Sequence, residues 1–364
     1  MHMTEFIPGL KLSKLFYQES VRPILEKHFP DLNYSAALIG HGSEVLGYDT
    51  PRSRDHHWGP QLQIFLSGND CEKYSLDIKS VLSKELPHKF KGYSTSFGDP
   101  DNIGVQLLVD KPDGPVNHKV VTLTPKSFFR YLLNFDPYDD ISVIDWLTFP
   151  QQELLSLTQG EVFWDGLDEL KTLRAKFHYY PKDVWLLLIA CQWKKISQQE
   201  AFIGRCAELG DELGSKLITS SLVNELMRLC FLFEKTYFPY SKWFGTAFSR
   251  LKCAGELTPI FTQVLNSSNC REHESILSKA YVIVGNLHNS LGITKPVESS
   301  ISDYFGRPYM VIHADRFSDA TMDAIQDEKL KVIKPRIGSV DQFSDNTDFL
   351  SSPRLVREFS IFFK

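Results

Sequence analysis

The sequence of 364 residues is long enough for two domains of ordinary size. Hydrophobic residues make up 42% and charged residues 23%, values typical of a folded globular protein that argue against intrinsic disorder. The net charge of −5 provides no overall attraction to a polyanion, so a nucleic-acid partner would need a local basic patch.

The cysteines and the first residues bear on the cellular location. The six cysteines contain no C-x-x-C pair, so we expect reduced thiols that are mostly packed in the core. Residues 1–9 lack the basic and apolar segments of a signal peptide, and no window approaches the roughly 18 uninterrupted apolar residues of a membrane span. We therefore expect a cytoplasmic protein with no membrane partner.

The first third of the chain combines helical and strand-like patterns. Apolar residues at spacings of three and four predict a helix over residues 12–28, with Pro23 weakening its middle. The full expected order is helix 12–28, strand 34–40, strand 61–66, helix 70–86, strand 104–109 and strand 119–124. This order is typical of an α+β domain with a small mixed sheet.

From about residue 127 onward the pattern becomes mainly helical. Apolar residues recur at helical spacing over residues 183–196 and 211–238. A short strand is expected at 309–312, and the polar stretch 338–352 is expected to be a loop. We therefore expect three consecutive domains: an α+β domain over 1–135, a mainly helical domain over 136–295 and a mixed C-terminal extension over 296–364.

A Gly-Ser dipeptide after the first expected strand is the first candidate for chemistry. Gly42 permits close approach of a ligand, and Ser43 adds a hydroxyl, so free backbone N–H groups and this hydroxyl can meet a triphosphate. Asp55 follows twelve positions after Ser43, just before the next strand, so both can meet at one end of the sheet. On its own, the dipeptide fits a plain turn with a helix cap better.

Further motifs along the chain form a recognisable set. They are residues 35–47, 55–60 (Asp-His-His-Trp-Gly-Pro), 145–147, 180–181, 210–211, 237–243 and 288–294. The Gly-Ser segment resembles the Gly-Ser and Asp-x-Asp signature of the nucleotidyltransferase superfamily. The whole set, over roughly residues 5–300, resembles more closely the uncharacterised DUF4037 family.

The superfamily resemblance implies a metal site built from three carboxylates. Two of them bind Mg²⁺ ions that bridge the nucleotide phosphates, and a third on a later strand helps to activate the acceptor hydroxyl. Carried over to this chain, Gly42 and Ser43 take the phosphate turn and Asp55 the first carboxylate. The second position falls on His57, and the third on Val121 or Thr122.

The two adjacent histidines allow a second interpretation of the same segment. Asp55 with an imidazole suits Zn²⁺ or Mn²⁺ better than Mg²⁺. Neighbouring residues of an extended strand point to opposite faces, which favours His57 over His56 as the ligand, with His118 as a distant partner. Alternatively, His56 packs structurally and His57 only hydrogen-bonds Asp55.

The helical region contains a second group of candidates around residues 237–243. Tyr240 and Lys242 can stack on a base or reach a phosphate, while a Pro-terminated helix with aromatic core residues is the alternative. Three further charged residues on helices are either additional contacts or ordinary surface and ion-pair residues: Arg205, Asp211 and Arg228.

Together these features predict a nucleotidyltransferase-like protein. It would bind ATP or another nucleoside triphosphate in an interdomain cleft, with Mg²⁺, Mn²⁺ or Zn²⁺ at Asp55 and His57, and Lys242 would offset phosphate charge. The nucleotidyl group would pass to an unknown acceptor, which is a small molecule, RNA or protein. The alternatives are a catalytically degenerate nucleotide-binding or regulatory protein, and a metal-dependent hydrolase that uses Asp55 and His57.

Overall fold

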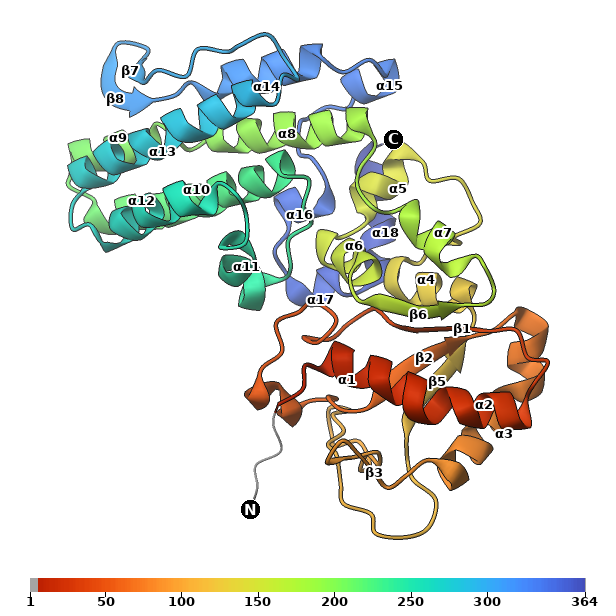
Figure 1. The fold of residues 1–364 in the computed structure, drawn as a ribbon. Helices are drawn as coiled ribbons and strands as arrows, with labels where there is room; N and C mark the ends of the chain where they lie inside the picture. The colour runs from red at the N-terminus through yellow and green to blue at the C-terminus, as the bar shows by residue number, and fades with distance from the viewer. Residues whose placement is uncertain (1–5, 364) are drawn as a thin grey trace. The chain divides into compact units, whose positions relative to one another are not determined.

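The computed structural model describes residues 6–363, apart from the side chain of Asp55 (Figure 1). Contacts divide the chain into two compact units. Unit 1 comprises Met1–Asp140 and Glu153–His178, and unit 2 comprises Ile141–Gln152 and Tyr179–Lys364. The units are thus built from interleaved segments, because a strand after residue 153 returns to the sheet of unit 1.

The centre of unit 1 is a four-stranded mixed sheet, as the α+β expectation requires. Its strands, in spatial order, are β5 (Lys119–Leu123), β2 (Gln61–Phe65), β1 (Ser35–Leu38) and β6 (Glu161–Asp165). β2 and β5 are parallel, whereas β1 is antiparallel to both β2 and β6. The first three strands confirm the strands expected around these positions, and β6 was not predicted.

Helices cover one face of this sheet (Figure 1). The covering segments are α1 (Gly9–Phe16), the π-helical segment η1 (Tyr17–Val21), α2 (Arg22–His28) and α3 (Gly68–Glu85). Leu62, Ile64 and Val120 point into the core that these helices complete. Because side chains alternate along a strand, Gln61, Gln63 and the neighbouring positions of β5 lie on the opposite face.

The strand expected over residues 104–109 is wrong. These residues form turns and extended loop, with a single bridge between Phe97 and Leu108. Leu107 is 50% exposed and Val109 40% exposed, whereas Leu108 packs against the core, so the segment contributes one side chain to the core without forming a strand. Two short hairpin strands, β3 (Lys89–Phe90) and β4 (Tyr93–Ser94), lie before this loop.

The remaining helices confirm the mainly helical second part of the chain. Unit 1 also contains α4 (Pro125–Leu133), α7 (Leu170–Ala175) and most of α6 (Gln151–Thr158). The helices of unit 2 are α5 (Val143–Thr148), α8 (Lys182–Ser197), α9 (Phe202–Leu209), α10 (Glu212–Phe233), α11 (Ser241–Phe248), α12 (Ala254–Asn266), α13 (Cys270–Ser290), α14 (Ala314–Asp323), α15 (Glu328–Lys331), α16 (Val340–Phe343), α17 (Thr347–Leu350) and α18 (Pro353–Glu358), followed by the 3-10 turn η3 (Phe359–Phe363).

Two features of the C-terminal part can be compared with the sequence. The expected strand at 309–312 is present as β8 (Arg307–Val311), which pairs with β7 (Ser302–Tyr304). The stretch 338–352 is not only loop, because it contains the short helices α16 and α17, the first of which begins at a capping box between Ser339 and Gln342.

Two further observations concern the cysteines and the helix lengths. All six cysteines are free thiols, and four of them are buried. Within residues 6–363, no helix has the length and apolar character that a membrane crossing requires.

Candidate functional site

The sheet brings the predicted phosphate turn and the residues before β2 to one end. β1 and β2 are antiparallel, with Ala37 opposite Gln63. The Ile39 N–H donates to Gln63 Oε1 at 3.2 Å, and Gln63 Nε2 donates to the Ile39 carbonyl at 2.9 Å. The chain leaving β1 and the chain entering β2 therefore share this end, where β5 also begins, since Lys119 pairs with Gln61.

The turn at Gly42 and Ser43 has a conformation that requires glycine. Gly42 has a φ of +145°, and a Cβ there would lie 2.7 Å from Glu44 Oε1. The Leu46 N–H donates to the Gly42 carbonyl at 3.2 Å, and the Tyr48 N–H donates to the Ser43 carbonyl at 2.8 Å. The segment therefore folds back as a compact turn.

Asp55 is placed by its backbone alone. It ends the 3-10 helix η2 (Pro51–Asp55), which begins at a capping box between Thr50 and Ser53. The side chain of Asp55 lies outside the described part of the structure. Its predicted role as a metal ligand therefore stays a prediction.

His57 faces a lysine of the neighbouring strand. Lys119 Nζ lies 2.6 Å from His57 Nδ1, and the backbone N–H of Gln106 also donates to this nitrogen at 3.4 Å. Burial and the Lys119 charge both lower the pKa of His57. The ring is thus a neutral hydrogen-bond acceptor at Nδ1, and only Nε2 is left for any other partner.

The other predicted partners of a metal site face elsewhere. The His118 ring contacts the Lys79 carbonyl of α3 and the Val120 N–H, each at 3.1 Å. It therefore lies on the helix-covered face, so the expected pairing of His118 with His57 is wrong. Of the two candidate positions for a third carboxylate, Thr122 pairs with buried Ile64, whereas Val121, on the face that carries Gln61 and Gln63, is 53% exposed.

The sequence analysis missed Glu44, which directly follows the turn. Its carboxyl is buried and accepts a hydrogen bond from Gln61 Nε2 at 2.9 Å. Burial, with a further contribution from the charge of Asp49, raises the pKa of Glu44 to about 7. Its position beside Gly42 and Ser43 was the signal available in the sequence.

Lys119 is the second missed residue. Besides its contact with His57, the ammonium lies 4.9 Å from the centroid of the Phe97 ring. Burial lowers the pKa of Lys119, and the charge of Glu44 offsets part of this decrease. Its signal in the sequence was its place two residues before Val121, on the same face of the expected strand.

A histidine within the turn adds a further charged group. His41 Nε2 lies 2.7 Å from Glu153 Oε2, whose side chain is almost fully buried, while the imidazole is half-exposed. Burial alone would lower the pKa of His41, but the hydrogen bond and charge of Glu153 outweigh it, so the pKa is raised. A protonated His41 is thus paired with the Glu153 carboxylate, and the pair adds no net charge to the turn.

The described side chains do not fit a magnesium site. Among them, no group of three or more His, Cys, Asp and Glu residues is arranged to hold a metal ion. The described groups at this end of the sheet include the Lys119 ammonium, the neutral His57 ring and the Glu44 carboxyl, whose pKa is raised to about 7. Mg²⁺ prefers ionised carboxylates and water, and an ammonium in its place repels it.

The predicted contacts of the helical region lie in unit 2. Tyr240 immediately precedes α11, and Lys242 Nζ lies 5.0 Å from the ring centroid of its neighbour Trp243. Arg205 pairs with Glu208 at 2.7 Å. Asp211 caps α10 by accepting the Gly214 N–H at 2.8 Å. These last two therefore have the ordinary structural roles that were kept as the alternative.

Part of the chain matches a known protein family. Residues 146–244 match the family model "Domain of unknown function (DUF4037)". The resemblance to DUF4037 is confirmed over these residues. The matched DUF4037 segment contains Tyr240 and Lys242 and ends before the C-terminal helices.

Solved structures and curated proteins add little to this assignment. The chain is similar to a nucleotidyltransferase-like protein from Exiguobacterium sibiricum 255-15, with 11% sequence identity over 76% of this chain and 77% of that chain. The TM-score is 0.32, which is too low to support an argument about fold or activity. No curated protein matches the chain.

Proposed function

We propose that this chain is a nucleotidyltransferase-like protein that binds ATP or another nucleoside triphosphate without a divalent cation. The phosphates would lie against the turn at Gly42 and Ser43, on the face of the unit 1 sheet that carries Gln61 and Lys119. Lys119 would supply the positive charge that a metal ion supplies in an active nucleotidyltransferase. The expected catalytic pair, Asp55 and His57, would then not transfer a nucleotidyl group.

The single observation that carries this proposal is the position of Lys119. It lies on β5, which pairs with β2 at the end of the sheet where the turn lies, and its ammonium is 2.6 Å from the His57 nitrogen. A fixed ammonium in a partly buried site attracts phosphate oxygens strongly, because water screens it less there than on an open surface. The raised pKa of Glu44 works in the same direction, since a protonated carboxyl does not repel phosphate.

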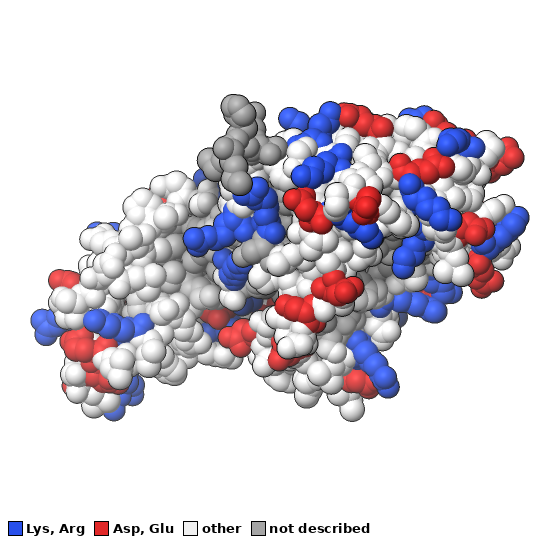
Figure 2. Space-filling view, turned by 90° about the horizontal axis from the view of Figure 1, so that it is seen from below, with Lys and Arg blue, Asp and Glu red and all other residues white. Residues whose placement is uncertain are grey.

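The other two functions have less support from the described residues. Nucleotidyl transfer in an interdomain cleft needs carboxylates that bind metal ions, and Val121 and His57 stand at two of the three expected positions. A hydrolase that uses Asp55 and His57 needs a third ligand, and His118 lies on the opposite face. An RNA acceptor would need a basic surface. The face drawn in Figure 2 carries both basic and acidic side chains, so it gives no specific support to this acceptor.

The test is calorimetric titration of ATP into the full chain, in EDTA and in Mg²⁺. We expect equal affinity in both, and no pyrophosphate release in a coupled assay. Lys119→Met should weaken binding about tenfold or more, since it removes a charge-assisted contact. Lys84→Met, which removes an exposed lysine of α3, is the matched control and should bind normally.

Two results would contradict the proposal. ATP binding that needs Mg²⁺ and is unaffected by Lys119→Met would show that metal, not lysine, neutralises the phosphates. Steady release of pyrophosphate with Mg²⁺ would show that the chain is an active nucleotidyltransferase, and Asp55→Asn should then abolish the release. Circular dichroism of each variant distinguishes lost binding from lost folding.

A further inference from the structure

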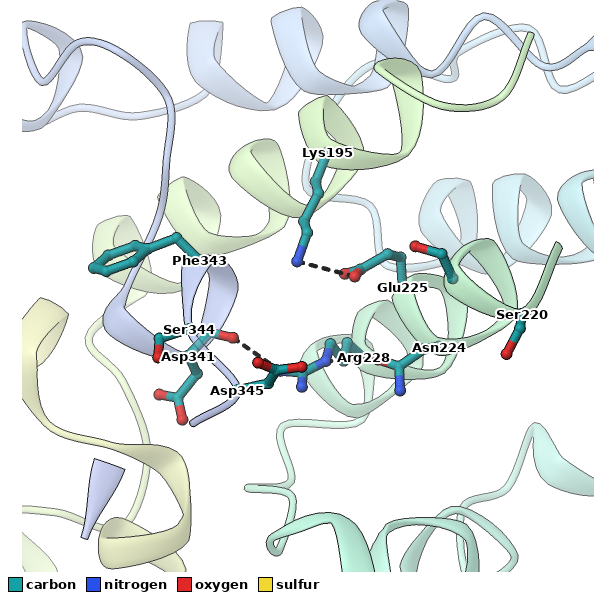
Figure 3. A pocket seen from close by; sticks show the side chains of 10 residues that line it. Lys195, Ser220, Asn224, Glu225, Arg228, Asp341, Phe343, Ser344 and Asp345 are labelled. Atoms are coloured by element: carbon teal, nitrogen blue, oxygen red, sulfur yellow. Dashed lines mark hydrogen bonds and ion pairs between the residues drawn. The ribbon is translucent and has the colours of Figure 1, made fainter. Parts of the chain in front are cut away.

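Unit 2 contains a polar cavity of about 360 Å³ that the proposed nucleotide site does not use (Figure 3). Helix α10 forms one wall, because residues at intervals of four share one helix face. The lining side chains come from α8, α10, α16 and the residues after α16: Lys195, Ser220, Ser221, Asn224, Glu225, Arg228, Asp341, Phe343, Ser344 and Asp345.

One side of the cavity is fixed by a buried carboxylate. Glu225 is 6% exposed, and its Oε1 lies 2.9 Å from Lys195 Nζ, toward which it points in Figure 3. Its Oε2 accepts from Gln192 Nε2 at 2.6 Å, and Gln342 Nε2 donates in turn to Gln192 Oε1 at 2.9 Å. These hydrogen bonds hold the lysine and the carboxylate in place before any ligand binds.

The opposite side is fixed by Arg228. Its Nε donates to Asn224 Oδ1 at 2.8 Å and its Nη1 to the Asp341 carbonyl at 2.9 Å. The guanidinium also lies 4.6 Å from the centroid of the Phe238 ring. Among the described residues, Nη2 of Arg228 has no hydrogen-bond partner, so it can donate to a ligand.

An aromatic cavity of about 140 Å³ adjoins this polar one. Asn224, Arg228, Asp341 and Asp345 line both, so the two cavities meet at these residues. The additional side chains of the second cavity are largely aromatic or apolar: Phe238, Pro239, Tyr240, Phe244 and Leu350. A ligand across both would have polar groups on one side and an apolar face on the other.

The mixture of charges restricts the ligand. The polar cavity is lined by two cationic side chains and three carboxylates. The carboxylates would repel an anionic ligand, and Lys195 and Arg228 would repel a cationic one. A hydroxyl group both donates and accepts hydrogen bonds, so it can satisfy either neighbour without added charge. We propose that this cavity binds a neutral polyhydroxylated ring, a sugar or a cyclitol, whose apolar face lies toward Phe238 and Tyr240.

Saturation-transfer NMR of the full chain tests the proposal. The probes are D-glucose and myo-inositol, each at ~10 mM to detect weak binding, with methyl phosphate and ethanolamine as charged probes. We expect saturation to be transferred from the protein to D-glucose and myo-inositol, and not to methyl phosphate or ethanolamine. Asp345→Ala should weaken polyol binding about tenfold, because it removes a charged acceptor from both cavities. Asp348→Ala, at an exposed carboxylate of α17, is the matched control.

A second variant separates binding from folding. Ser221→Phe places a large side chain in the polar cavity from α10, one turn before Glu225, so it should abolish transfer, and its melting temperature shows whether the variant stays folded. Transfer to neither polyol, or transfer to methyl phosphate or ethanolamine alone, would overturn the assignment. Equal polyol binding by the wild type, Asp345→Ala and Ser221→Phe would also overturn it.

Discussion

At the scale of single residues, Glu44 makes stability depend on pH. Burial raises the pKa of its carboxyl to about 7 in the folded chain, from an ordinary value near 4.5. The folded state therefore holds its proton more tightly than the unfolded state does. The stability contributed by this group is fully present below the unfolded pKa of about 4.5, and it is lost as pH rises through 7.

Glu44→Gln should remove the loss of folding stability that occurs as pH rises through 7. The amide can still accept the hydrogen bond from Gln61, and it carries no charge to desolvate. We expect a gain on the order of 3 kcal/mol in unfolding free energy at pH 8, and almost none at pH 4, from urea unfolding at each pH. Glu72→Gln, at an exposed position of α3, is the control. A gain equal at both pH values would mean that Glu44 is ionised throughout.

Substitutions at His57 test whether Lys119 occupies the place that a Mg²⁺ ion has in a nucleotidyltransferase. His57→Asp would place a carboxylate beside the Lys119 ammonium, and the resulting ion pair should make Mg²⁺ binding no stronger than in the wild type. The double variant His57→Asp, Lys119→Met removes the ammonium, so only this protein should gain a rise in melting temperature with Mg²⁺ over EDTA. The measurement is thermal melting of all three proteins in both buffers.

The result for the single variant is decisive. A Mg²⁺-dependent rise in melting temperature for His57→Asp alone would show that Lys119 does not occupy the place of the ion. The charge model of the site would then be wrong, and the transferase alternative would gain support.

At the scale of elements, Arg357 attaches the C-terminal helix α18 to α5 within unit 2. Its guanidinium pairs with Asp145, donates to Thr148 Oγ1 at 2.6 Å and lies 5.2 Å from the Phe149 ring centroid. Asp145 is buried and also caps α5 through Ser142. Removing the arginine would leave this carboxylate desolvated without its cation.

Arg357→Leu should therefore cost about 2–3 kcal/mol in the unfolding free energy of unit 2. Urea unfolding followed by far-ultraviolet circular dichroism gives the value. Arg354→Leu, at an exposed position of the same helix, should change it by less than about 0.5 kcal/mol. Equal transitions for the two variants would mean that α18 is held by apolar contacts alone.

The same scale shows why some elements were predictable and others were not. Residues 104–109 and 119–123 have similar apolar patterns, but the first segment forms only the single bridge between Phe97 and Leu108, whereas the second pairs along its length with Gln61 to Phe65. β6 joins the sheet from more than a hundred residues away, and its exposed Trp164 breaks the expected alternation. Local pattern identifies candidate strands, and pairing over long distances decides between them.

Some features of the candidate site were likewise predictable from the sequence, and others were not. The turn at Gly42 and Ser43 and the segment before β2 are visible in the sequence, because glycine and the following polar residues lie between two strand patterns. The roles of Glu44 and Lys119 were not visible, since they arise from the contacts with Gln61 and His57 that the sheet creates. The short helices α16 and α17 were missed because four residues give no periodicity to read.

At the scale of the whole molecule, the two proposed sites belong to different units. Every described group that the nucleotide proposal uses lies in unit 1, and every lining group of the polyol cavity lies in unit 2. Each ligand stabilises the region that binds it, by an amount set by its concentration relative to the dissociation constant. Local protection from hydrogen exchange therefore identifies the unit in which each ligand binds.

We expect ATP to slow amide exchange in residues 39–48 and 119–123, and to leave residues 238–244 unchanged. The first two segments form the turn and the start of β5, where the phosphates are proposed to lie. The third contains Tyr240 and Lys242, whose contribution to a nucleotide site the sequence predicts. Hydrogen-exchange mass spectrometry with and without ATP, in EDTA, gives the comparison, and AMP serves as a control that lacks the β and γ phosphates. Protection of 238–244 together with 39–48 would contradict the single-unit site, and Lys242→Met should then weaken ATP binding as strongly as Lys119→Met does.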